Sequence, residues 1–279
     1  MTSTGHLHFQ NYPAGVPHTV DVEEFRSIAE VFDRSAAAYG DRIAYINMGK
    51  AITYRELEEQ SRHFGAYLQN RVGLKKGARV ALMMPNMLQY PVALFGALRA
   101  GLTVVNCNPL YSARELQHQL SDSGAEAIVV VENFAHVLAD VVEKTGLKAV
   151  FTTRLGDMLG FPKGTIVNLV VKHVKKMVPP WHIPGAVSFT SAVSEGRGLP
   201  WQPVATDLSD IAFLQYTGGT TGVPKGAMLT HGNIVANLTQ AHAWIRPAVD
   251  EKGETIVTAL PLYHIFALTA NCLTFMKIG

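Results

Sequence analysis

The segment Leu214 to His231 reads LQYTGGTTGVPKGAMLTH and concentrates residue types that bind phosphate. Between Thr217 and Lys225 it places three glycines, three threonines and one lysine. Glycine lacks the Cβ atom that would keep a phosphate away from backbone N–H groups, and successive N–H groups in such a turn form an anion site. Threonine hydroxyls add hydrogen-bond donors, and the lysine adds a positive charge on a flexible side chain. The spacing therefore predicts a loop that holds a polyphosphate.

This loop differs from the two common phosphate-binding patterns. The pattern G-x-x-x-x-G-K-[ST] would need glycine at 224 and serine or threonine at 226, where this chain has Pro224 and Gly226. The segment does not contain G-x-G-x-x-G either. Residues 227–229 read as a short strand, and a helix cap follows only at 230–233, so the N–H groups of the loop, and not a helix dipole, would contact the anion. Glycine and threonine also occur in plain hairpin turns, but their combination with lysine at this spacing favours the phosphate loop.

The elements that position the loop alternate between strand and helix. Thr53 with Glu56, and Ser112 with Glu115, have the spacing of helix capping boxes. Such alternation predicts an α/β fold with a doubly wound, mostly parallel sheet. Four apolar runs have the length of buried strands: 79–84, 103–108, 127–131 and 148–153.

Three further elements are predicted from local pattern. A helix is expected over 22–38, and an apolar run at 255–260, which Pro261 ends, predicts another strand. A short strand at 211–216 leads into the loop, so the loop leaves the end of a strand, where open α/β sheets bind ligands.

Composition and charge exclude several classes of protein. The chain is 48% hydrophobic and 16% charged, as in globular proteins. Its net charge of +2, without a basic stripe, makes nucleic acid an unexpected partner. Cys107 and Cys272 lie in apolar stretches and predict buried free thiols in a reducing compartment. The sequence shows neither an export signal at its start nor a run of about eighteen apolar residues, so we expect a cytoplasmic protein.

Two motifs carry a resemblance to a known superfamily. YTGGTTGVPKG at 216–226 resembles the signature loop of the adenylate-forming enzymes, which include acyl-CoA synthetases, luciferases and the adenylation domains of peptide synthetases. TALPLYHIFALT at 258–269 resembles their second core motif, in which a histidine follows an aromatic residue at the mouth of the acyl pocket. Segments 81–125 and 170–184 are most similar to bacterial long-chain fatty acid–CoA ligases, and the likeness covers nearly the whole chain.

The resemblance implies a reaction and its substrates. Adenylate-forming enzymes join a carboxylate to the α-phosphorus of ATP with loss of pyrophosphate, and then transfer the acyl group to a thiol. The implied substrates are a fatty acid, ATP and coenzyme A, with Mg²⁺ as the metal. A carboxylate is already a nucleophile, so the absence of an obvious general base in the sequence agrees with this chemistry. Catalysis would consist mainly of positioning and charge neutralisation.

The resemblance also implies roles for particular residues. His264 would lie beside the carboxylate and the α-phosphate, with Tyr263 and Phe266 near the start of an acyl tunnel. Thr217 and Lys225 join His264 as candidate catalytic residues, and Thr217 is the candidate Mg²⁺ contact. A histidine at 264 considered alone would more often be structural, but the upstream loop favours the functional role. The candidate nucleotide-binding residues are Tyr216, Thr217, Gly218, Gly219, Thr220, Thr221, Gly222, Val223, Pro224, Lys225, Gly226 and Ala227.

The family pattern predicts a division of the chain and its incompleteness. An N-terminal arm would cover 1–21, a first α/β lobe 22–205 with an irregular connection from about 154, and the start of a second α/β lobe 206–279. The family's adenine-stacking strand, Tyr-Gly-x-Thr-Glu motif, ribose-binding aspartate and C-terminal catalytic lysine are not found in this sequence. We therefore expect an N-terminal fragment. The alternatives are a non-catalytic nucleotide-binding fragment, a synthetase for another carboxylic acid, and a fatty acyl-AMP ligase.

The segment 166–178 allows two interpretations. Apolar residues recur at helical spacing while three lysines lie elsewhere on the helix, as in helices that lie on a membrane surface. An ordinary surface helix would show the same pattern with its apolar stripe in the core. The first interpretation would make the protein peripheral on the inner face of the cytoplasmic membrane. A homodimer is the other partner expected.

Overall fold

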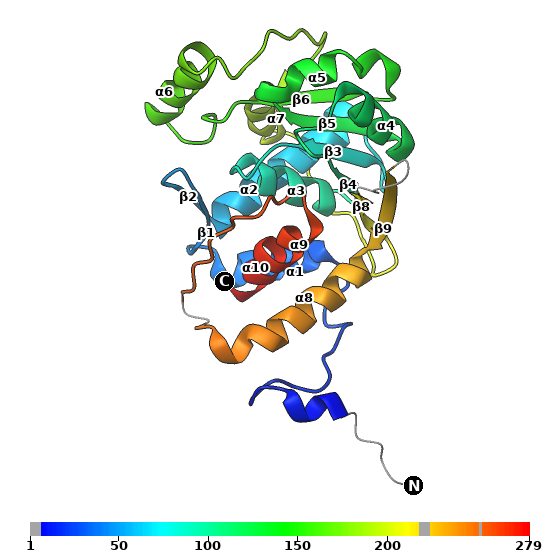
Figure 1. Cartoon of the computed structure of the whole chain (residues 1–279), viewed down its shortest axis with the longest axis vertical. Helices are drawn as coiled ribbons and strands as arrows, with labels where there is room; N and C mark the ends of the chain where they lie inside the picture. Colours follow the sequence, from blue (N-terminus) through cyan, green and yellow to red (C-terminus); the bar gives the residue numbers. More distant parts are fainter. Residues whose placement is uncertain (1–6, 218–223, 251–252) are drawn as a thin grey trace.

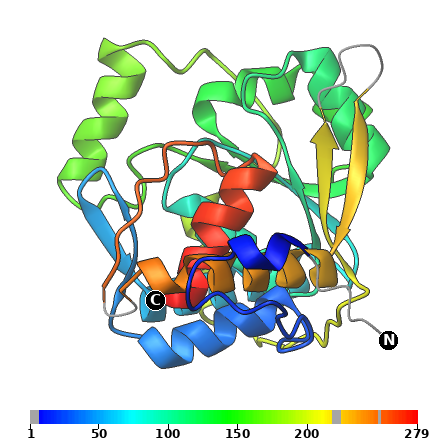
Figure 2. The same cartoon turned by 60° about the horizontal axis from the view of Figure 1, so that its bottom comes forward.

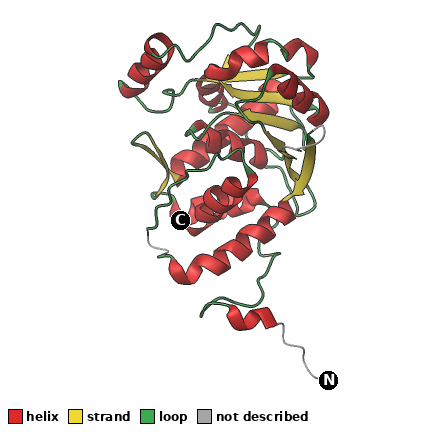
Figure 3. Cartoon of the chain, viewed as in Figure 1, coloured by secondary structure: helices red, strands yellow, loops and turns green. Residues whose placement is uncertain are grey.

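The computed structural model of the chain describes residues 7–217, 224–250 and 253–279. Within these ranges the centre is a seven-stranded sheet of order β7-β6-β5-β3-β4-β8-β9. Its strands are yellow in Figure 3, where helices are red. Neighbouring strands are parallel, except that β8 and β9 are antiparallel, so the predicted α/β class is confirmed. The strands are β3 (Arg79–Met83), β4 (Thr103–Asn106), β5 (Ala125–Val131), β6 (Ala149–Thr153), β7 (Val187–Ser188), β8 (Ile211–Thr217) and β9 (Lys225–Thr230), with the separate hairpin β1 (Ile43–Asn47) and β2 (Lys50–Thr53).

Helices cover both faces of the sheet, and each face has its own apolar core (Figure 1). Side chains alternate along β3, so that Val80 and Leu82 pack in one core while Ala81 and Met83 pack in the other. The first core includes residues of α1, α2, α3, α7 and α8, and the second includes residues of α4 and α5. The helices are α1 (Ile28–Tyr39), α2 (Tyr54–Tyr67), α3 (Gln89–Arg99), α4 (Ala113–Ser123), α5 (Ala135–Ala139), α6 (Lys163–Leu169), α7 (Phe189–Gly196), α8 (His231–Ile245), α9 (Ile265–Ala267) and α10 (Thr274–Ile278).

The capping boxes expected at the starts of α2 and α4 are present. A third one opens α8, where the Thr230 hydroxyl accepts the N–H of Asn233. The helix expected over 22–38 begins later, at Ile28. Ser27 ends the preceding irregular segment, because its hydroxyl accepts the N–H of Glu30 and so takes the N-cap position.

The strands expected to open a second lobe join the sheet of the first. β8 pairs in parallel with β4, with Asn106 aligned to Gln215, and β9 forms the edge of the sheet (Figure 1). The edge of β4 would otherwise leave backbone N–H and C=O groups without partners, and β8 supplies them. Among the described residues, 206–279 thus contribute a hairpin and helices to one shared sheet, and the division at 205 stays a prediction.

The connection from about 154 to 207 contains more structure than expected. The sequence pattern predicts one helix there, at 166–178, but the segment holds α6, the edge strand β7 and α7. α6 lies at the periphery of the molecule (Figures 1 and 2). It is attached through its inner side, where Gly164 is buried and the amide oxygen of Asn168 accepts the N–H of Gly156 at 2.8 Å.

The apolar stripe of this helix and its continuation lies outside the core. Ile166 is 56% exposed and Val174 is 69% exposed, so the interpretation with a core-facing stripe is wrong for these side chains. The three lysines of the segment 166–178 and Lys163, at the start of α6, are exposed as well. The exposed apolar residues, called here the α6 face, are Phe161, Ile166, Leu169, Val170, Val174 and Met177.

The segment 255–260 is extended but is not a strand. Among the described residues no strand pairs with it, although β1 lines a pocket together with it, and the side chain of Asn86 supplies hydrogen bonds instead. The Asn86 amide donates to the carbonyl groups of Thr258 and Leu260 and accepts the N–H of Leu262. Val257 is 83% exposed. The β pattern of the segment is therefore present in the sequence, but among the described residues the segment forms no ladder with a neighbouring strand.

Both cysteines are buried and unpaired, as expected. Cys107 directly follows β4, and burial raises the pKa of its thiol. Cys272 lies between α9 and α10, 3.0 Å from the hydroxyl oxygen of Tyr45, and burial raises its pKa to about 12. Across the described ranges, no helix is both long and apolar enough to cross a membrane.

Candidate active site

The β8–β9 hairpin holds the two ends of the predicted phosphate loop. In the hairpin register Thr217 lies opposite Lys225, at the point where both strands leave the sheet (Figure 2). Both side chains are exposed, so a hydroxyl and an ammonium group flank the loop from its two ends. Ala227 is exposed on β9, farther from the loop. The predicted phosphate-binding residues that lie outside the described ranges are Gly218, Gly219, Thr220, Thr221, Gly222 and Val223.

Tyr216 and Gly226 are paired across the hairpin in a different way. Tyr216 is 8% exposed and packs in the core beside α4. Its hydroxyl donates to the carboxylate of Asp122 at 2.5 Å. Burial, together with this carboxylate, raises the pKa of the phenol, so the hydroxyl stays a donor. A Cβ atom at Gly226 would lie 3.0 Å from the Tyr216 ring, so the glycine leaves room for that ring. These two residues therefore support the hairpin from inside.

His264 is placed at the start of α9. Its backbone is extended and its Nδ1 accepts the N–H of Phe266 at 3.4 Å, so the imidazole acts as an N-cap. His264 and Phe266 are exposed, and Tyr263 is half-buried. The second nitrogen of the imidazole, Nε2, has no hydrogen-bond role in this cap. A structural role and an exposed position thus coincide in the same side chain.

A chain of side-chain amides connects the loop strand to the His264 segment. Gln215, at the end of β8, donates its amide to the carbonyl oxygen of Tyr263 at 3.2 Å. The Gln215 amide oxygen accepts from Asn106 at 3.3 Å, and the hydroxyl of Tyr90 donates to the Asn106 amide oxygen at 2.8 Å. Because Tyr90 and Asn106 are buried, these bonds hold the two predicted motifs at the same edge of the sheet.

Sequence reasoning missed the contribution of α4. His118 Nε2 lies 3.1 Å from the carbonyl oxygen of Pro224, and the Gln119 amide donates to the carbonyl oxygen of Asn106 at 2.8 Å. His118 thus contacts the residue before β9, Gln119 contacts β4, and Asp122 contacts β8. The spacing of His118 and Asp122, four residues apart on a capped helix, was visible in the sequence. The residues that His118 and Asp122 contact could not be read from the sequence, because these partners lie about a hundred residues away along the chain.

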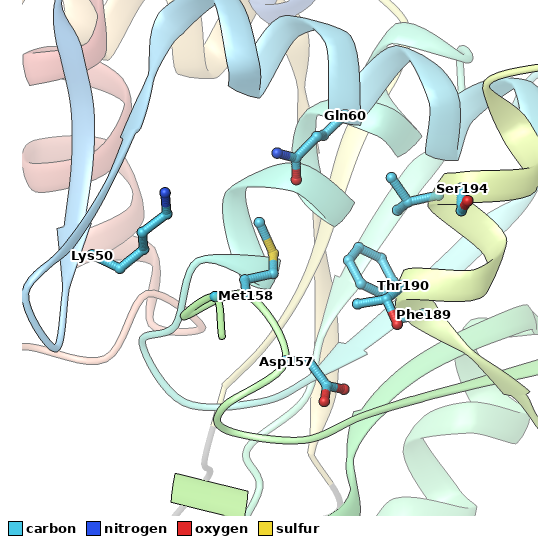
Figure 4. A pocket seen from close by; sticks show the side chains of 9 residues that line it. Lys50, Gln60, Asp157, Met158, Phe189, Thr190 and Ser194 are labelled. Carbon is cyan, nitrogen blue, oxygen red and sulfur yellow. The ribbon is translucent and has the colours of Figure 1, made fainter. Parts of the chain in front are cut away.

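A separate hollow is lined by residues of β2, α2, α7 and the segment 157–160 (Figure 4). Its volume is about 350 Å³, and none of its lining residues belongs to the predicted site. The side chains of Met158 and Phe189 border it, together with the polar side chains of Gln60 and Thr190. It therefore adds nothing to the phosphate loop.

The residues at the loop fit a nucleotide better than they fit a metal. A hydroxyl and an ammonium opposite each other suit phosphate oxygens. Mg²⁺ is bound through carboxylates, waters and substrate phosphates. Thr217 offers one hydroxyl, and the described ranges contain no group of three or more His, Cys, Asp or Glu residues arranged to hold a metal ion. Any Mg²⁺ at this site would depend on ligands other than these side chains.

The fold and the loop define the class of protein. The sequence profile of the AMP-binding enzyme family matches residues 32–279. The chain belongs to this family.

Named relatives narrow the comparison. The chain is 58% identical over 268 residues to a long-chain-fatty-acid–CoA ligase of Salmonella typhimurium, covering 96% of this chain and 48% of the relative. It is 34% identical to the ligase of the same name in Bacillus subtilis, covering 96% of this chain and 47% of the relative. The chain thus spans about half the length of the curated relatives it matches, which agrees with the expected N-terminal fragment.

Solved structures show the same architecture. A long-chain-fatty-acid-CoA ligase from Archaeoglobus fulgidus matches with a TM-score of 0.71 at 26% identity, over 95% of this chain and 48% of that chain. An anthranilate CoA ligase in complex with anthranoyl-AMP matches with a TM-score of 0.75 at 18% identity, over 93% of this chain and 45% of that chain. The second likeness concerns the fold alone.

Proposed function

We propose that this chain is the N-terminal part of a ligase that activates a long-chain fatty acid with ATP and then transfers the acyl group to coenzyme A. The observation that carries the proposal is the Thr217–Lys225 pair at the mouth of a Gly/Thr loop, in a chain 58% identical to a long-chain-fatty-acid–CoA ligase. The carboxylate would attack the α-phosphorus of ATP, forming the acyl-phosphate bond and breaking the bond to pyrophosphate. The coenzyme A thiol would then take the acyl group and release AMP.

The residues of this chain would act mainly by charge and position. Lys225 and the loop N–H groups would neutralise the β- and γ-phosphates, which otherwise repel the incoming carboxylate. His264 would use the imidazole nitrogen that does not cap α9, beside the carboxylate and the α-phosphate. Tyr263 and Phe266 would border the acyl chain. Mg²⁺, when bound, would supply further charge neutralisation.

The test is pyrophosphate exchange by the complete protein that carries this sequence. With ATP, Mg²⁺ and oleate, labelled pyrophosphate should enter ATP, and adding coenzyme A should yield oleoyl-CoA. Octanoate, benzoate and cinnamate separate the long-chain ligase from a synthetase for another acid. Exchange without acyl-CoA formation would identify a fatty acyl-AMP ligase instead. No exchange with any of these acids would contradict the proposal.

We also propose that the α6 face contacts the cytoplasmic membrane. Its exposed apolar side chains are accompanied by Lys163, Lys172, Lys175 and Lys176, and the sequence has no aspartate or glutamate from 158 to 194. Each lysine near an anionic lipid surface contributes about 1 kcal/mol to binding. The apolar side chains would enter the headgroup region. A ligase for acids that partition into bilayers would thereby meet its substrate at the surface.

Sedimentation with phosphatidylglycerol vesicles tests this contact on the 279-residue chain itself. The wild-type chain should pellet with vesicles at low salt, and Lys172/Lys175/Lys176→Glu should not. Lys75/Lys144/Lys148→Glu changes the same charge on exposed lysines elsewhere and should still pellet. The double variant Ile166→Ser/Val174→Ser should weaken the part of the vesicle binding that persists when the salt concentration is raised. Equal pelleting of all variants would refute the contact. Size-exclusion chromatography of the same samples would reveal a homodimer.

A further inference from the structure

The two ends of the phosphate loop are both held by one helix. α4 reaches Pro224 through His118 and Tyr216 through Asp122. The two α4 residues are four positions apart, so their side chains lie on the same face of the helix. Pro224 immediately precedes β9 and Tyr216 is the last residue but one of β8. The contacts therefore lie where the chain leaves the sheet and where it returns.

The hairpin needs such support because of its place in the sheet. β9 is the edge strand and pairs only with β8, so its outer side has no strand among the described residues. Edge hairpins open more easily than central strands, since fewer hydrogen bonds hold them. A loop that binds phosphate through charge and N–H groups works only if those groups are fixed beforehand. The element that contacts both ends of the loop is α4, which is capped at both ends and packs Leu116 and Leu120 in the core.

We propose that His118 and Asp122 are positioning residues for the phosphate loop. His118, with its proton on Nε2, donates to the Pro224 carbonyl and fixes the return of the chain into β9. Asp122 accepts from the Tyr216 hydroxyl and fixes the exit from β8. Gly226 belongs to the same arrangement, because any larger residue there would displace the Tyr216 ring. Tyr216 and Gly226 would thus serve the nucleotide indirectly, through the geometry of the hairpin, without touching it.

The structural arm of the test measures hydrogen exchange in β8 and β9 of the 279-residue chain. His118→Phe and Tyr216→Phe each remove one hydrogen bond and keep a ring of similar size. A single such bond corresponds to about a three- to tenfold change in local opening, so backbone amides of the hairpin should exchange faster by about that factor. His118→Gln keeps a donor near the Nε2 position and should restore slow exchange. Ser121→Ala, an exposed position on the same helix, is the control and should change nothing.

The kinetic arm uses the complete protein and rests on the proposed function. His118→Phe should raise the KM for ATP and lower the rate of pyrophosphate exchange several-fold, while the KM for the fatty acid stays near its wild-type value. His118→Gln should recover most of both ATP parameters. A general loss of stability would instead affect all substrates alike and would not be rescued selectively.

The outcomes separate the two proposals. Unchanged exchange in β8 and β9 for both His118→Phe and Tyr216→Phe would overturn the positioning role, whatever the activity. A His118→Gln variant as impaired as His118→Phe would show that the hydrogen bond is not responsible, and would overturn it too. A complete wild-type protein without pyrophosphate exchange would contradict the proposed function, while the structural arm would still decide the role of α4.

Discussion

At the residue scale, the site combines side chains that face the loop with side chains that only hold it. Thr217 and Lys225 are exposed at the two ends of the loop, whereas Tyr216 is buried beside α4. The sequence could not separate these roles, because all three belong to one continuous motif. Successive side chains of a strand point to opposite faces of the sheet. In the structure Tyr216 points to the α4 side, and its neighbours in the strand do not.

Replacing Lys225 tests the charge that we assign to the loop. Lys225→Ala in the complete protein should slow pyrophosphate exchange by roughly a hundredfold, the usual effect of losing one fixed group that stabilises developing charge. The fold should survive, because the side chain is exposed. Thermal unfolding checks this, and Lys148→Ala, on an exposed lysine elsewhere, serves as the control. An exchange rate equal to wild type would remove Lys225 from the site.

His231 gives the stability of the chain a pH dependence. It is 1% exposed, its Nδ1 accepts the N–H of Ile28 at 3.1 Å, and burial lowers its pKa to about 4 from an ordinary 6.5. Asp207 and Asp210 oppose this shift and Lys76 adds to it. Between about pH 4 and 6.5, His231 therefore binds a proton in the unfolded chain but not in the folded chain. The contribution of neutral His231 to stability is complete above the unfolded pKa and is lost as the pH falls from 6.5 toward 4.

Urea unfolding measured at several pH values would show this contribution. Below the unfolded pKa, the free energy of unfolding should fall by up to about 1.4 kcal/mol per pH unit from this residue. His231→Asn keeps an acceptor near the Nδ1 position but does not titrate, so its curve should be flatter over the same range. Parallel curves for both proteins would contradict the assignment.

At the scale of elements, the sequence predicted what is set locally. Both capping boxes and the parallel strands 79–84, 103–108, 127–131 and 148–153 were correctly foreseen, because each depends on residues within a few positions. The strand expected at 255–260 was wrong, since a ladder needs a partner that local pattern cannot supply. The interpretation that the apolar stripe of α6 faces the core was wrong for the same reason. An amphipathic pattern shows that one face of a helix is apolar, but it does not show which part of the molecule, if any, covers that face.

The contact between α2 and α3 depends on two glycines. A Cβ atom at Gly96 would lie 2.8 Å from the carbonyl oxygen of Ser61, and one at Gly65 would lie 2.9 Å from the carbonyl oxygen of Gly96. Gly96→Ala should therefore force the helices apart and lower the free energy of unfolding by about 1–3 kcal/mol. Gly146→Ala meets nothing within 4 Å and should leave stability unchanged or slightly higher. Equal urea midpoints for the two variants would mean that the helices adjust freely.

At the scale of the whole molecule, the chain carries the seven-stranded sheet and the two ends of the loop but spans about half the length of its curated relatives. Incubated with ATP, Mg²⁺, oleate and coenzyme A, the 279-residue chain alone should form no measurable oleoyl-CoA. We expect this because the chain covers 48% of the length of a long-chain-fatty-acid–CoA ligase to which it is similar. The complete protein is the positive control. Acyl-CoA formation at a comparable rate by both would mean that these 279 residues contain a full active site.

The reactivity of the two buried thiols can show when different parts of the chain unfold. A thiol reagent can modify Cys107 or Cys272 only when the surrounding structure opens, because both are buried and their raised pKa values keep them protonated. One thiol reports on the central sheet and the other on the helical segment 265–278. With Cys107→Ala and Cys272→Ala proteins, labelling rates in increasing urea would time each opening separately. We expect Cys272 to react first, which would show that the last helical segment detaches while the sheet that carries the loop stays closed. Equal rates with equal urea dependence would mean that both parts open in a single cooperative event.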